Sequence, residues 1–86
     1  MEEEKKIVAE FAEQMLLKIQ ERHNRYAPLG WKTMDMKRLL ALLKGELAEL
    51  EEKGADMKDE AIDVANYALF IWYKAQDKWK NVFDVK

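Results

Sequence analysis

Four carboxylates in this chain have a spacing that could do chemistry. Glu46 and Glu49 are three residues apart, and so are Glu60 and Asp63. Side chains at this spacing lie on one face of a helix, so each pair presents two carboxylates to the same side. Hard oxygen ligands on a rigid scaffold suit Mg²⁺ or Mn²⁺. The chemistry that this set predicts is metal-assisted attack of water on a phosphoanhydride.

Three helices are expected to position these carboxylates. Two breaks, at 27–30 and 53–56, separate stretches that favour helix and carry few β-branched runs. Thr33 or Asp35 is expected to cap the second helix, Asp56 the third, and Gly54 suits the C-terminal end of the second. The predicted helices cover about 3–26, 34–53 and 57–80.

The two acidic pairs are symmetric about the second break. A short turn makes the helices on either side pack antiparallel. Residues equidistant from that turn then lie level, which places Glu49 opposite Glu60 and Glu46 opposite Asp63. Carboxylates about 4 Å apart repel by roughly 1–4 kcal/mol per pair, so four of them need protons or cations between them.

The third helix is apolar around most of its circumference, which indicates burial on nearly all sides. Two neighbouring helices do not cover such a surface, and a chain of 86 residues buries only about 60% of its unfolded surface when it folds alone. We therefore expect one all-α domain spanning residues 1–86. Its three main helices form an antiparallel hairpin-based bundle, and dimerisation completes a four-helix bundle.

Composition excludes several classes of function. The net charge of −2 argues against broad electrostatic binding of nucleic acid, and the absence of cysteine excludes disulfides and thiol chemistry. The acidic N-terminus is not a signal peptide, and no stretch approaches the ~20 apolar residues of a membrane span. A cytoplasmic protein without a membrane partner is expected. A di-iron bundle requires Glu-x-x-His motifs. The only histidine is His23, and the residue three positions before it is Gln20 rather than Glu, which argues against a di-iron site.

Two plainer interpretations of the acidic pairs stand beside the metal site. Pairs of Glu on one face are usual on solvated helices, and Glu51 and Glu52 follow directly. The chain could equally be a helical bundle that holds no metal. Against both, the two pairs match in register, and Asp63 lies in an apolar helix, where a carboxylate needs a ligand or a cation.

The chain resembles the MazG-like family of all-α nucleoside triphosphate pyrophosphohydrolases. The resemblance covers roughly residues 16–75. It rests on the ExxE…ExxD pattern of the four acids and on the residues around it: Asn24 through Gly30-Trp31, Leu39-Leu40, Glu46-Leu47-x-Glu49-Leu50 and Asp59-Glu60-Ala61-x-Asp63-Val64-Ala65-Asn66-Tyr67.

The resemblance implies a function and a ligand set. Members of the family cleave nucleoside triphosphates to a monophosphate and pyrophosphate with Mg²⁺, and they form dimers or dimers of dimers. By resemblance, Glu46, Glu49, Glu60 and Asp63 are the catalytic residues and metal ligands, and one of them also orients the attacking water. The partners expected are a nucleoside triphosphate and other copies of the chain, as a homodimer or homotetramer.

Four further residues are candidates for substrate binding. The resemblance implies that His23 and Trp31 lie against the base and that Tyr67 borders the site. Asn66, one turn after Asp63, is expected to support the ligands. Each has a structural alternative as well: Trp31 as a plug over helix ends, His23 as an exposed helix residue and Tyr67 as part of the core.

Two features depart from the family pattern. Ten residues separate Glu49 from Glu60, where the family usually has about a dozen or more, and Gly45 stands where many relatives carry Glu. The alternative function is therefore a catalytically inactive helical oligomerisation or nucleotide-binding module of the same fold.

Overall fold

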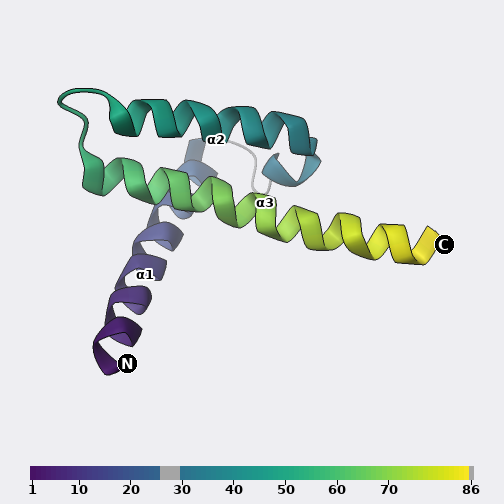
Figure 1. Cartoon of the computed structure of the whole chain (residues 1–86), viewed down its shortest axis with the longest axis horizontal. Coiled ribbons are helices and arrows are strands. Elements are labelled where there is room, and N and C mark those ends of the chain that lie inside the picture. Colours follow the sequence, from purple (N-terminus) through teal and green to yellow (C-terminus); the bar gives the residue numbers. More distant parts are fainter. Residues whose placement is uncertain (26–29, 86) are drawn as a thin grey trace.

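A computed structural model describes residues 1–25 and 30–85, with side chains for 1–22 and 30–76. Within these residues the helix is the only regular secondary structure and no strand is present, as the predicted all-α class requires (Figure 1). None of the described helices is long and apolar enough to cross a membrane. The elements in chain order are α1 (Glu2–Arg25), a short 3₁₀ helix η1 (Gly30–Thr33), α2 (Met36–Glu51) and α3 (Met57–Val85).

The helices α2 and α3 form the antiparallel hairpin that the short turn predicts (Figure 1). Asp35 caps α2, since its Oδ1 accepts a hydrogen bond from the backbone N–H of Arg38 at 2.8 Å. Asp56 Oδ1 accepts a bond from the N–H of Asp59 at 3.3 Å, as expected of a residue that caps α3. Gly54 lies in the turn with φ +84°, a conformation that glycine adopts without strain.

The helix boundaries differ from the predicted ones by a few residues. The cap at Asp35 starts α2 at Met36 rather than at 34. Its last turn ends at Glu51, because the capping residue Glu52 already has an extended backbone. No breaker follows Lys80, and α3 continues to Val85 instead of ending near 80.

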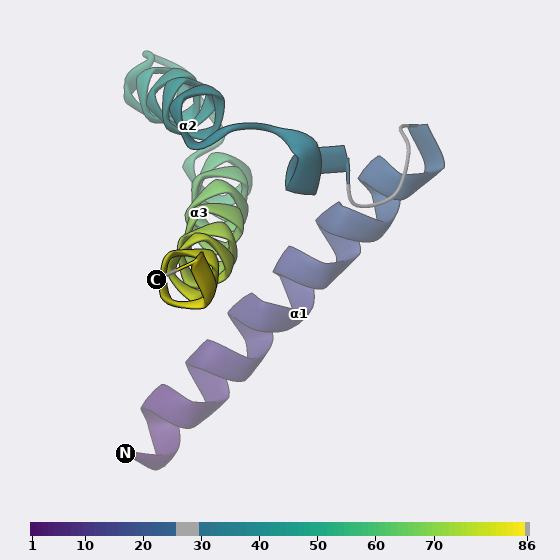
Figure 2. The ribbon, with the colours of Figure 1, turned by 90° about the vertical axis from the view of Figure 1, so that its right-hand side faces the viewer.

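The helix α1 crosses the hairpin on the side of α3 (Figure 2). Only its second half packs, through Met15, Lys18, Ile19 and Arg22. Residues 1–14 are all exposed, and in Figure 1 this half of the helix projects away from the other two. Because α1 crosses the hairpin and does not run alongside it, the three helices of the single chain do not form a bundle along their whole length (Figure 1 and Figure 2).

A small core holds the three helices together. Leu39, Tyr67 and Phe70 are buried, and Ile19, Trp31 and other partly buried apolar side chains pack around them. The ring of Trp31 stacks on Phe70 at a centroid distance of 4.4 Å. Several large apolar side chains of α3 stay exposed, among them Leu69, Trp72 and Tyr73. Within one chain, therefore, α3 is covered only in part.

Candidate functional site

Three of the four predicted carboxylates meet near the turn of the hairpin. Glu46 and Glu49 come from α2 and Glu60 from α3, and one oxygen of each lies within 4.8 Å of the others. This convergence follows from the register of the hairpin, which sets Glu49 level with Glu60. The residues therefore offer a divalent cation three oxygen ligands from two helices.

Asp63 belongs to a second group of carboxylates. Its oxygen lies within 4.8 Å of oxygens from Asp59 and Glu60, so Glu60 is common to both groups. The side chain of Asp63 is occupied by Lys18 of α1, whose Nζ donates to both carboxylate oxygens at 3.0 Å. The same ammonium donates to Asp59 Oδ2 at 2.9 Å. The cation that Asp63 needs is thus supplied, in this structure, by a lysine.

The electrostatics of the first group reflect its unbalanced negative charge. Burial, a hydrogen bond with Glu49 and the charges of Glu49, Asp63 and Glu60 raise the pKa of Glu46 to about 7. The pKa of Glu60 is also raised, by desolvation and then by the charges of Glu49 and Asp63, and Lys18 opposes this shift. Carboxyls with raised pKa values next to one another are typical of functional sites.

Two oxygens in this group have no partner among the described residues. Glu46 Oε2 and Glu60 Oε2 are both buried and accept no hydrogen bond. A buried carboxylate oxygen without a donor is unfavourable by several kcal/mol if it is charged, so it calls for a proton or a cation. The donor set and these two oxygens fit a hard divalent cation such as Mg²⁺.

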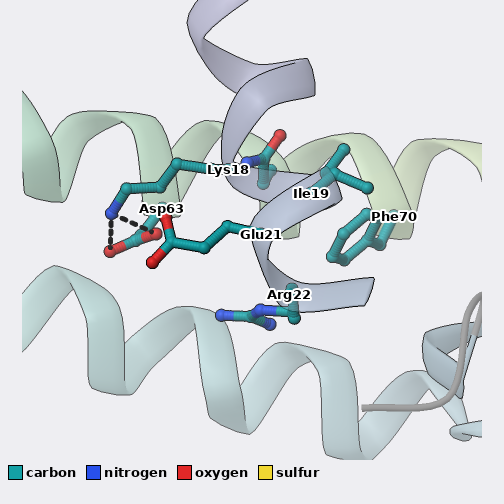
Figure 3. Close-up of a pocket in the computed structure, with 7 residues that line it drawn as sticks. Lys18, Ile19, Glu21, Arg22, Asp63 and Phe70 are labelled. Atoms are coloured by element: carbon teal, nitrogen blue, oxygen red, sulfur yellow. Dashed lines mark hydrogen bonds and ion pairs between the residues drawn. The ribbon is translucent and has the colours of Figure 1, made fainter. Parts of the chain in front are cut away.

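A pocket of about 240 Å³ opens beside Asp63, between α1 and α3 (Figure 3). Lys18 and Arg22 lie one turn apart on α1 and both line it. Figure 3 shows Lys18 and Asp63 pointing toward each other, with Glu21 next to this pair. Arg22 Nη1 donates to the hydroxyl of Tyr67 at 2.9 Å, and its guanidinium lies 5.2 Å from the centroid of that ring.

Two of the residues predicted to bind substrate lie at this pocket or next to it. Asn66 lines the pocket, is 6% exposed and donates from Nδ2 to the carbonyl of Met15 at 3.2 Å, while its Oδ1 has no partner. Tyr67 is buried behind Arg22 and packs edge-on against Phe70 at 5.8 Å. Its ring contributes to the core as well as to the wall behind the site.

The other two are not brought to the carboxylates by what the structure describes. Trp31 packs on Phe70 and Tyr73 and lines a separate pocket of about 170 Å³ with Lys32 and Lys74. Its role toward a base stays a prediction, since this placement matches the alternative of a plug over the core. The side chain of His23 lies outside the described residues.

Three residues of the site carry no signal in the motif. Lys18 and Arg22 lie on the first helix, more than 40 positions from their partners on α3. Asp59 stands directly before Glu60 in the stretch that carries the resemblance, but it is not one of the four acids of the motif. Their spacing of four residues puts Lys18 and Arg22 on one helical face, but nothing in the sequence links that face to the carboxylates.

Comparison with known proteins places the chain among relatives without describing its activity. No family model and no solved structure matches it. It is similar to an uncharacterized protein from Archaeoglobus fulgidus, with 30% identity over an alignment that covers 92% of this chain and 90% of the archaeal protein. The chain therefore belongs to the same family as this archaeal protein.

Proposed function

We propose that this protein is a Mg²⁺-dependent hydrolase that converts a nucleoside triphosphate to a monophosphate and pyrophosphate. The proposal rests on one observation: Glu46, Glu49 and Glu60 converge, and one carboxylate oxygen each of Glu46 and Glu60 is buried without a hydrogen-bond partner among the described residues. The resemblance of the ExxE…ExxD pattern to MazG-like pyrophosphohydrolases supplies the substrate class.

The residues of the chain divide the task between two neighbouring areas. Glu46, Glu49 and Glu60 would hold the ion, with Asp63 joining once its carboxylate is free of Lys18. A bound Mg²⁺ supplies charge stabilisation for the phosphoryl oxygens. The pocket beside Asp63, with Lys18 and Arg22 in its wall, is where the anionic phosphate chain would lie.

The exposed apolar side chains support the second part of the proposal, a homodimer that completes a four-helix bundle. Trp72 is 59% exposed and Leu69 is 37% exposed on α3, while Ile7, Val8 and Phe11 are exposed on the projecting half of α1. Exposed apolar residues gathered on two helices mark a surface that a partner covers. A second copy of the chain supplies the missing helices.

The second candidate function is an inactive module of the same fold that binds nucleotides or only oligomerises. The ion pair between Lys18 and Asp63 favours it, because a lysine already neutralises one of the four acids. This candidate predicts folding and self-association without turnover.

Turnover separates the two candidates. Each ribo- and deoxyribonucleoside triphosphate is incubated with the protein and Mg²⁺ or Mn²⁺, and phosphate is measured with and without added inorganic pyrophosphatase. The proposal predicts phosphate that depends on the pyrophosphatase. Glu49→Gln and Asp63→Asn should lower kcat by at least about 10²-fold, since each removes a ligand charge.

Glu51→Gln is the matched control, because Glu51 is exposed at the end of α2 and outside both carboxylate groups. It should keep wild-type activity. Circular dichroism of all three variants checks that they fold. A full panel without any hydrolysis contradicts the enzymatic proposal and favours the inactive module.

A further inference from the structure

The ammonium group of Lys18 is bound by the second group of carboxylates, through Asp59 and Asp63. It donates three hydrogen bonds, two to Asp63 and one to Asp59. The side chains of Lys18 and Asp63 are 24% and 18% exposed, so the pair is largely removed from water. Burial lowers the pKa of Lys18, but the hydrogen bonds and charges of Asp59 and Asp63 outweigh it and raise the pKa above its usual value. The side chain of Lys18 is therefore protonated and positively charged at neutral pH.

This position conflicts with a divalent cation at Asp63. Both Asp63 oxygens accept from Lys18, so neither is free to turn fully toward the group formed by Glu46, Glu49 and Glu60. A metal ion held at about 2.1 Å by Asp63 would also lie within a few ångströms of the ammonium, where two positive charges repel. Withdrawal of Lys18 from at least one of these oxygens would therefore favour a divalent cation at Asp63.

The pocket next to Asp63 offers the ammonium another place. Lys18 forms part of its wall, and Asn66, which is 6% exposed, lines the same space. Arg22, one turn further along α1, adds a guanidinium on the same side. A phosphate chain in this pocket would meet two cations from a single helix.

We propose that Lys18 is a displaceable counter-ion, which neutralises Asp63 in the metal-free protein and turns into the pocket toward phosphate oxygens when a divalent cation takes the carboxylates. This inference rests on the proposed function, because it takes the carboxylate groups as the cation site. It assigns to Lys18 two opposite effects: competition with the metal and attraction of the anionic substrate.

The competition is tested by titrating Mn²⁺ into the metal-free protein and following free Mn²⁺ by electron paramagnetic resonance. Lys18→Met should bind Mn²⁺ roughly tenfold more tightly than wild type, because a competing unit charge is gone. Lys5→Met is the control: Lys5 lies on the same helix, pairs with Glu2 at 3.7 Å and is 69% exposed, so its loss should change the affinity less than about twofold. A folded Lys18→Met variant that binds Mn²⁺ no more tightly than wild type overturns the proposal.

The displacement is tested in the wild-type chain, which needs no variant to fold. The rate of acetylation of each lysine by a limiting reagent is measured by mass spectrometry with and without saturating Mg²⁺. Release from Asp59 and Asp63 should speed acetylation of Lys18 and leave Lys5 unchanged in the same sample. An unchanged or slower rate at Lys18 overturns the proposal.

These readouts distinguish the proposal from the function on which it rests. Mn²⁺ binding and Lys18 release in a protein that hydrolyses no triphosphate contradict only the enzymatic function. Hydrolysis with Lys18 still protected contradicts only the exchange. If neither wild type nor Lys18→Met binds Mn²⁺, both fail.

Discussion

Glu46 is the residue at which the acidic site is most sensitive to pH. Its pKa of about 7 means that, without a cation, it keeps a proton while most carboxylates of the protein have lost theirs. Protonation of Glu46 relieves part of its repulsion with Glu49 and Glu60. Any cation that binds must replace this proton, so cation binding and proton release are linked.

The metal-free protein should lose stability as the pH rises from 5 to 8. An acid whose pKa is raised from 4.5 to about 7 binds more protons in the folded state than in the unfolded state over this window. The free energy of unfolding therefore falls as the pH rises through the window, and the decline levels off above the raised pKa of about 7. Urea unfolding at several pH values, with a chelator present, measures it.

Glu46→Gln tests the assignment of this pH dependence. The neutral amide should flatten the decline and make the metal-free protein more stable at pH 8 by about 1 kcal/mol, discounted for solvent screening. Glu51→Gln should follow the wild-type curve. An identical slope in wild type and Glu46→Gln would show that another group controls the titration.

At this scale the sequence predicts the acids but not their cation. The i,i+3 spacing identifies all four carboxylates, because both residues of each pair share one helix face. Lys18 could not be found in this way, since its contact with Asp63 joins residues 45 positions apart. That contact depends on where α1 crosses α3, and no local periodicity encodes the crossing.

Among the elements, the hairpin of α2 and α3 is the part that sequence determines most fully. The breakers, the caps at Asp35 and Asp56 and the short turn define it, and its register brings Glu46, Glu49 and Glu60 together. The path of α1 is less predictable. Its apolar stripe continues through Ile7, Val8 and Phe11, but in the single chain only the second half of the helix finds a partner.

Leu39 is the residue of α2 on which the packing of the hairpin depends most. It is fully buried between α2 and the Tyr67–Phe70 part of α3. Leu39→Ala should lower the free energy of unfolding by about 2–5 kcal/mol, because it removes buried methyl groups and leaves a cavity. Thermal unfolding followed by circular dichroism measures the loss.

Leu40→Ala is the neighbouring comparison, since Leu40 is 43% exposed in the single chain. Its loss should be clearly smaller than that of Leu39→Ala. Equal losses would mean that Leu40 is as deeply buried in the functional assembly as Leu39, or that the hairpin packs in another register.

At the scale of the whole molecule, many large apolar side chains of the single chain are exposed. Only Leu39, Ile62, Tyr67 and Phe70 are buried apolar residues among those described, whereas Trp72 and the apolar residues of α1 remain in contact with water. The sequence indicates this through the apolar circumference of the third helix. It does not indicate which face would meet a second copy of the chain, since that choice depends on the shapes of two surfaces.

We expect light scattering to give a molar mass that is a multiple of the 10.2 kDa mass of one chain. Trp72→Glu should shift it toward the monomer, because a buried charge in an apolar interface is unfavourable by several kcal/mol. Gln76→Glu, at an exposed position of the same helix, adds the same charge and should leave the mass unchanged. A monomeric wild-type protein would contradict the completed bundle.

The proposed activity requires that the carboxylate groups at the hairpin support cleavage between the α and β phosphates. Phosphorus NMR of a nucleoside triphosphate mixed with the protein and Mg²⁺ tests this most directly. The wild-type protein should give equal amounts of monophosphate and pyrophosphate signals, and Glu49→Gln should give neither. Orthophosphate with a nucleoside diphosphate, or unchanged triphosphate across all bases and sugars, would contradict it.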